Sequence, residues 1–72
     1  MEFKDFIGVQ DYSAKYCKNR SYDAVFHLFG NDLCIEGRHK GNNSLNERID
    51  IPLDRLNKGS VIRAVHRVVS ER

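Results

Sequence analysis

The sequence predicts an α+β fold: a three-stranded antiparallel β-meander packed against a C-terminal helix, with a helix before the sheet completing the order α-β-β-β-α. Three observations predict it. Residues 22–29 alternate between apolar and polar side chains, as a half-buried strand does. A Gly-Asn-Asp turn then leads into a second apolar segment. Residues 60–69 carry apolar side chains at helical spacing. At 72 residues, the chain is expected to be one small domain, 1–72.

The last segment has the clearest helical pattern. Five apolar residues share one helical face: Val61, Ile62, Val65, Val68 and Val69. Arg63 and Arg67, four positions apart, lie on the other side. We therefore expect a helix that begins near residues 57–60, with its apolar face in the core.

The middle of the chain predicts three strands, at 22–29, 33–36 and 48–53, with a polar loop at 39–46. Pro52 marks the end or an edge of the third strand, because proline has no backbone donor. In the second and third strands, the side chains expected to face the core are Leu33, Ile35, Ile49, Ile51 and Leu53.

Residues 1–20 allow two interpretations. A helical face could be formed by Phe3, Phe6, Ile7, Ala14 and Cys17, whereas Phe3, Ile7 and Val9 also fit a strand. Gly8 interrupts either pattern. We favour a helix or helical turn over 11–19, with Asp11 or Ser13 as its cap.

Composition excludes several classes of protein. An apolar fraction of 40% and a charged fraction of 31% are typical of a folded domain. No membrane span or signal peptide is recognisable, so a cytoplasmic location is expected. Cys17 and Cys34 are expected to be buried free thiols. Because the histidines are not at zinc-ligand spacing with them, no metal and no cofactor are expected.

Positive charge gathers at the C-terminal end. Residues 55–72 hold five basic side chains and one acid, whereas the first 54 residues hold seven basic and nine acidic ones. This end is either a solvated helix face or a surface for an anionic partner. The candidate nucleic-acid or partner-binding residues are Arg38, His39, Lys40, Arg55, Lys58, Arg63 and Arg67.

Two features make nucleic acid a reasonable partner. Lys58 stands at the start of the predicted helix, where free N–H groups and the helix dipole favour a phosphate. Tyr22, Phe26 and Phe29 could stack on bases from the sheet, although a chain this small is expected to use them in its core.

No catalytic motif is present in the sequence. It contains no phosphate-binding glycine loop, no His-Glu-x-x-His and no Gly-x-Ser-x-Gly. His27, in mid-strand, is expected to be structural or to face a partner. Glu36 and Asp50 are expected to be surface charges that pair with Arg38 and Arg48. We therefore expect a protein that is not an enzyme.

The segment from Ile51 to Val61 resembles the tail of HicA-type toxins, which are small ribonucleases with the fold of double-stranded-RNA-binding domains. A strand ending in an aliphatic-Pro step, here Ile51-Pro52, is followed by Lys58-Gly59-Ser60-Val61, which matches the start of that family's last helix. The resemblance implies an α-β-β-β-α fold. The family's catalytic histidine follows a Gly-Ser, whereas this chain has Arg20-Ser21-Tyr22, so the resemblance carries over no catalytic residue.

Three functions follow as hypotheses. The first is a small regulatory protein that binds RNA or DNA, or a protein of a nucleic-acid-handling complex, through its basic C-terminal helix. The second is an inhibitor of the kind phages encode, which would bind and block a protein in the host cytoplasm. The third is a HicA-like ribonuclease. None of them involves a membrane or a small-molecule cofactor.

Overall fold

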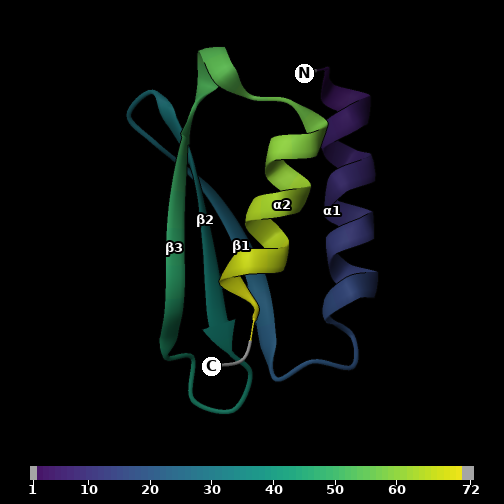
Figure 1. The fold of residues 1–72 in the computed structure, drawn as a ribbon, viewed down its shortest axis with the longest axis vertical. Helices are drawn as coiled ribbons and strands as arrows, with labels where there is room; N and C mark the ends of the chain where they lie inside the picture. The colour runs from purple at the N-terminus through teal and green to yellow at the C-terminus, as the bar shows by residue number, and fades with distance from the viewer. Residues whose placement is uncertain (1, 71–72) are drawn as a thin grey trace.

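Two helices cover one face of a three-stranded antiparallel sheet in the computed structural model, which describes residues 2–70 apart from the side chain of Phe3 (Figure 1). The strand order is β1-β2-β3, which confirms the predicted meander and fold class. No helix within residues 2–70 combines the length and apolar character needed to cross a membrane. The elements are α1 (Phe3–Cys17), β1 (Tyr22–Phe29), β2 (Asp32–His39), β3 (Leu45–Pro52), the 3-10 helix η1 (Leu53–Arg55) and α2 (Lys58–Val68).

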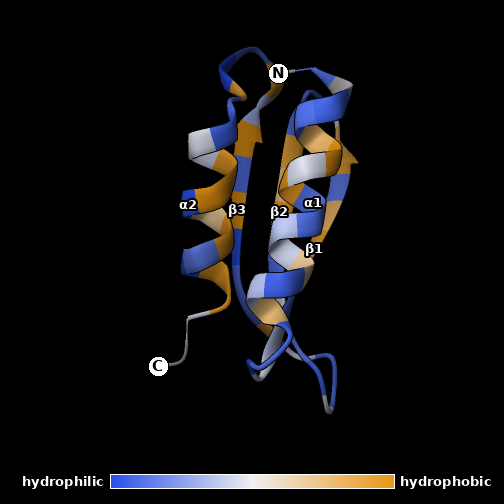
Figure 2. Cartoon of the chain, turned by 90° about the vertical axis from the view of Figure 1, so that its right-hand side faces the viewer, coloured by the Kyte–Doolittle hydropathy of each residue, from blue (hydrophilic) through white to orange (hydrophobic). Residues whose placement is uncertain are grey.

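The core lies between the helices and the inner face of the sheet (Figure 2). The predicted apolar face of α2 is confirmed, since Val61, Val65, Val68 and Val69 are buried and Ile62 is half-buried. Opposite them, the buried strand residues are Leu33, Ile35 and Ile51, with Tyr22, Ala24, Phe26 and Ile49 packed at the margin. Both cysteines are free and buried, as predicted.

The first helix is longer than the sequence predicted. It begins at Phe3 rather than near Asp11, and the carboxylate of Asp5 accepts the Glu2 N–H at its start (3.3 Å). Its core-facing side chains belong to Phe6, Val9, Ser13, Tyr16 and Cys17, whereas Ile7 and Ala14 are exposed. Ser13 is therefore a buried helix residue and not a cap. Gly8 is tolerated because Phe6 before it and Val9 after it pack against the core, and this packing outweighs the low helix propensity of glycine.

The bounds of β2 and β3 also differ from the prediction. β2 continues to His39, because Gly37 stays paired with β1 and does not end the strand. β3 begins at Leu45, which lies opposite Arg38 beyond an irregularity in the register. Leu53 is not an inward-facing strand residue, since it starts η1 and is exposed, while its N–H donates to the carbonyl of Asn31.

Gly37 brings α2 into direct contact with the central strand. A Cβ atom at this position would lie 1.7 Å from the carbonyl oxygen of Val68, so only glycine fits. Beside it, the Asn46 side-chain amide donates to the carbonyls of Val68 (2.8 Å) and Ser70 (3.0 Å). These bonds satisfy acceptors that the end of a helix otherwise leaves unpaired.

Two glycine substitutions should therefore change stability in opposite directions. Gly37→Ala should destabilise the domain by about 1–3 kcal/mol or more, because α2 must move off the sheet. Gly8→Ala should stabilise it by about 0.5–1 kcal/mol, since nothing lies within 4 Å of a Cβ there and alanine favours the helix. Urea unfolding followed by circular dichroism measures both. Equal midpoints for Gly37→Ala and the wild type would contradict the close contact.

Candidate functional site

The predicted binding residues lie in two separate places. α2 begins at one end of the molecule, whereas the loop after β2 lies at the other end (Figure 1). Arg55 and Lys58 flank the start of α2, and Arg63 and Arg67 follow along its exposed side. Arg38, His39 and Lys40 belong to the far end, so the seven residues do not form one surface.

The three residues at the far end make contacts within the fold. Arg38 forms an ion pair with Glu36 at 3.0 Å. The Lys40 ammonium donates to the carbonyl of Cys17 at 2.6 Å, so a cation lies at the C-terminal end of α1, where the helix dipole favours it. His39 accepts the Gly41 N–H through its Nδ1 atom (3.0 Å). These contacts explain the positions of the three side chains without a ligand.

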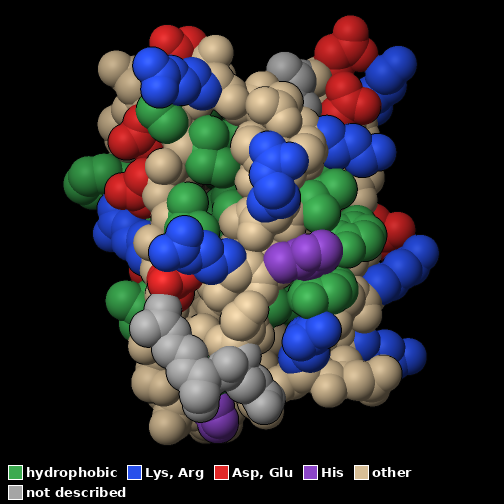
Figure 3. Space-filling view, in the orientation of Figure 1, with side chains coloured by type: hydrophobic (Ala, Val, Ile, Leu, Met, Phe, Trp, Pro, Cys, Tyr) green, Lys and Arg blue, Asp and Glu red, His purple; other side chains and the backbone are tan. Residues whose placement is uncertain are grey.

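The exposed side of α2 is different, because two of its cations have no acidic partner in the described part of the chain. Within residues 2–70, no carboxylate lies within ion-pair distance of Lys58 or Arg63. Arg67 does have a partner, the carboxylate of Glu47 at 2.9 Å. Figure 3 shows Lys and Arg side chains spread over both helices on this face. Lys58 and Arg63 are therefore the cations of α2 best placed to meet an external anion.

The start of α2 is already capped by the chain itself. The Asn57 side chain accepts the Ser60 N–H at 2.9 Å, and the Ser60 hydroxyl donates to the Asn57 carbonyl at 2.9 Å. One of the helix's free donors is thus satisfied internally. A phosphate near Lys58 would meet the lysine and the remaining N–H groups of the first turn.

A column of rings that was not predicted from the sequence connects the two helices. The Tyr16 ring stacks on His66 with centroids 4.4 Å apart, and the Arg20 guanidinium lies 4.1 Å from the Tyr16 centroid. The Tyr12 hydroxyl is hydrogen-bonded to His66 Nε2 (2.6 Å). Tyr12 and Tyr16 are four residues apart on α1, a spacing that could have indicated this shared face. Arg63 lies one turn before His66 and so adjoins the column, whereas Lys58 lies about two turns before His66, at the start of the helix.

The aromatic residues of β1 divide between the core and the surface. Tyr22 and Phe26 pack against the core, which supports the expectation of a structural role. Phe29 is 67% exposed and Leu28 is 68% exposed. Beside Leu28, an apolar pocket of about 430 Å³ lies where β1, the start of α1 and η1 meet, and its apolar lining includes Phe6, Phe26, Leu33, Leu53 and Leu56.

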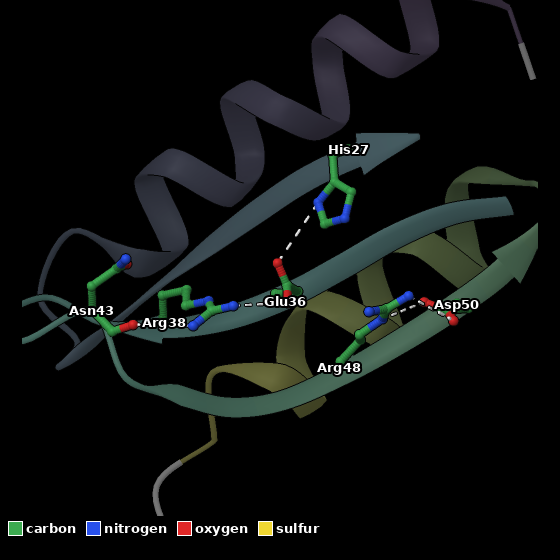
Figure 4. A network of polar contacts seen from close by, with 6 residues as sticks. All are labelled: His27, Glu36, Arg38, Asn43, Arg48 and Asp50. Carbon is green, nitrogen blue, oxygen red and sulfur yellow. Dashed lines mark hydrogen bonds and ion pairs between the residues drawn. The ribbon is translucent and has the colours of Figure 1, made fainter. Parts of the chain in front are cut away.

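The outer face of the sheet carries a polar network (Figure 4). The predicted pairs are present: Glu36 with Arg38 at 3.0 Å, and Asp50 with Arg48 at 3.0 Å. His27 Nδ1 lies 3.7 Å from the other oxygen of Glu36. The Cys34 thiol lies among these groups, so the side chains that could hold a metal are those of His27, Cys34 and Glu36.

Three groups of this network have displaced pKa values, and the pKa of Arg48 is raised chiefly by its hydrogen bond to Asp50. Burial raises the pKa of the Cys34 thiol to about 11, and the hydrogen bond to Asp50 acts in the same direction. The Arg48 guanidinium, followed by the Cys34 thiol, lowers the pKa of Asp50 by hydrogen bonding to its carboxylate. At neutral pH, the outer face therefore holds a protonated thiol beside an ionised carboxylate.

No family model, no curated protein and no solved structure matches this chain. The resemblance of residues 51–61 to HicA-type toxins stays a prediction. In the structure, Lys58-Gly59-Ser60-Val61 does open the last helix. Arg20-Ser21-Tyr22 leads into β1 without a histidine, and His27 lies on the outer face of the sheet, away from the helices.

The raised pKa of Cys34 should make stability fall in alkaline solution. A thiol with a pKa of 9.0 when unfolded and about 11 when folded contributes its full stabilisation below pH 9 and loses it as the pH rises towards 11. Urea unfolding at several pH values should show a smaller alkaline loss for Cys34→Ala than for the wild type. Identical pH profiles of the two proteins would contradict the raised pKa.

Proposed function

We propose that this protein is a small non-catalytic binding protein that contacts RNA or DNA through the exposed face of its two helices. The observation that carries the proposal is that Arg63, a cation without an acidic partner in residues 2–70, lies one turn from His66 in the column of Tyr12, Tyr16, His66 and Arg20. Lys58, which also lacks such a partner within residues 2–70, extends the positive charge to the start of the same helix. Cations beside aromatic rings suit a ligand with phosphates and bases.

The charge of α2 supports a polyanionic ligand. Between Lys58 and Ser70 the chain has three cationic side chains, not counting His66, and no acidic one. Because the Arg67 charge is paired with Glu47, a polyanionic ligand would be attracted chiefly by Lys58 and Arg63. Few phosphate contacts and a net charge of +2 predict modest affinity that weakens steadily as salt is added.

The ring column offers bases two accessible surfaces. Tyr16 is contacted by both His66 and Arg20, so little of its ring is left for a ligand. Tyr12 and Arg20 are the exposed members of the column. A base would stack on one of these two, and Arg20 could add a cation–π contribution.

A titration with labelled single- and double-stranded RNA and DNA tests the proposal, with fluorescence anisotropy as the readout. The wild type should bind at micromolar concentration in low salt. The double variant Lys58→Gln/Arg63→Gln should bind more weakly, and the slope of log affinity against log salt should fall by about 2, because two phosphate contacts are lost. Gel analysis of the RNA afterwards should show intact strands, whereas cleavage would support the ribonuclease hypothesis.

A matched control changes the net charge equally at the far end of the molecule. In Asn42→Asp/Asn43→Asp, the first aspartate can still accept the Ser44 N–H, and the second tolerates the positive φ of 59° at position 43. This control should bind as the wild type does. An equal loss in both double variants, or no binding by the wild type, would contradict the helix-face proposal.

A protein partner is the second candidate function, and the apolar pocket beside β1 is the observation that favours it. An inhibitor of the kind phages encode could hold a segment of its target there, against the exposed Leu28. In a pull-down from host extract, Leu28→Glu should then lose a specific protein that Lys58→Gln/Arg63→Gln retains. If Lys58→Gln/Arg63→Gln lost that protein while Leu28→Glu retained it, this alternative would be contradicted.

A further inference from the structure

Three metal-ligating side chains meet on the face of the sheet that the helices leave open. Figure 4 shows two of them, His27 and Glu36. His27 on β1 lies directly across from Cys34 on β2, and Glu36 follows two residues later on the same strand and the same face. The ligand atoms of these three side chains all lie within 4.8 Å of one another. Neighbouring strands thus place a nitrogen, a sulfur and an oxygen donor around one point.

We propose that His27, Cys34 and Glu36 bind a transition-metal ion of the zinc class. Thiolate and imidazole donors favour zinc over magnesium and calcium, which prefer oxygen ligands alone. Three protein ligands leave one position of a tetrahedral ion for water, as in zinc sites that remain open to solvent. His27 is exposed, so the ion would enter from its side of the cluster.

Neighbouring residues hold two of the three donors in position. Arg38 binds one oxygen of Glu36 at 3.0 Å, which leaves the oxygen nearer His27 to act as a ligand. Before an ion binds, the Cys34 thiol donates to Asp50, which is itself held by Arg48, whose Nε and Nη2 atoms lie 3.0 and 3.3 Å from its two oxygens. This hydrogen bond positions the sulfur in the metal-free protein and is lost with the thiol proton. Contacts like that of Arg38 with Glu36 orient ligands at established metal sites.

Burial and charge are also compatible with an ion. Cys34 is fully buried and Glu36 is 8% exposed, although only side chains of β1 and β3 cover them. On binding, the thiol releases its proton to water and the sulfur coordinates as thiolate. Two arginines, two carboxylates, one thiolate and a divalent ion then sum to a single positive charge, so the site gains little net charge.

The spacing of these residues explains why the sequence predicted no metal site. Six residues separate His27 from Cys34, and a turn lies between them. The register of the hairpin brings them opposite each other, because the two-residue loop at Gly30-Asn31 sets Phe29 against Asp32. A metal site across two strands has no short motif, in contrast to a Cys-x-x-Cys pair.

Cobalt titration of the metal-free wild-type protein tests the proposal, with Co²⁺ as a spectroscopic substitute for Zn²⁺. We expect thiolate-to-cobalt charge-transfer absorption in the near ultraviolet that saturates at one equivalent and disappears when Zn²⁺ is added. Zn²⁺ should also raise the thermal unfolding midpoint, because the ion binds only the folded arrangement. Absence of the charge-transfer band at one equivalent of Co²⁺ with micromolar protein would overturn the proposal.

Four variants locate the site, each checked for folding by circular dichroism. Cys34→Ser should lose the charge-transfer band, and His27→Ala should bind Co²⁺ about tenfold or more weakly. Cys17→Ala and His39→Ala remove a thiol and a histidine outside the cluster, so both should bind Co²⁺ as the wild type does. A band that persists in Cys34→Ser, or that disappears in Cys17→Ala, would place the metal elsewhere and overturn the proposal.

Discussion

The C-terminal turn of α2 lies directly on the central strand, and the rest of the fold depends on that contact. The carbonyl of Val68 occupies the space that a side chain at residue 37 would need, and the amide of Asn46 binds the same carbonyl. With this end of the helix fixed, each turn of its apolar face lies above the inner residues of the sheet. Val65 and Val61 are thereby buried against the aliphatic side chains of β2 and β3.

Because helices cover only one face of the sheet, β2 is shielded in two different ways. On the inner face, Ile35 is enclosed by the two helices. On the outer face, Cys34 and Glu36 are enclosed by side chains from the flanking strands, and most of those side chains are polar or charged. The protein therefore has an apolar layer inside and a small layer of hydrogen bonds and ion pairs outside. These layers give the helix face and the open sheet face different chemistry.

The strong periodicities of the sequence predicted most of the fold. The valine face of α2 and the alternation in β1 each indicate one kind of element, so both elements were placed correctly. The start of α1 was wrong because Gly8 weakens the helical pattern where the helix begins. The predicted end of β2 was wrong because a glycine usually weakens a strand, whereas Gly37 is required there by the carbonyl of Val68, 31 residues further along the chain. Contacts between distant segments leave no local pattern.

The candidate sites were less predictable than the fold. Charge counting identified Lys58 and Arg63, but it could not separate them from Lys40 and Arg38, whose charges are used within the fold. The ring column depends on the angle at which α1 lies beside α2, and the cluster around Cys34 depends on the hairpin register. Both are properties of packing. The sequence therefore identified the basic residues in part, held only the spacing of Tyr12 and Tyr16 as a sign of the ring column, and gave no indication of the cluster around Cys34.

The pair formed by Gly37 and Asn46 has a consequence for recognising distant relatives. Aliphatic residues in the core can replace one another over evolutionary time, because a small change at one site can be offset at its neighbours. Neither member of this pair has such a substitute, since one position tolerates no side chain and the other supplies an amide to the end of a helix. A glycine and an asparagine nine positions apart, on adjacent strands before a final valine-rich helix, would mark common ancestry after most other identities had been lost.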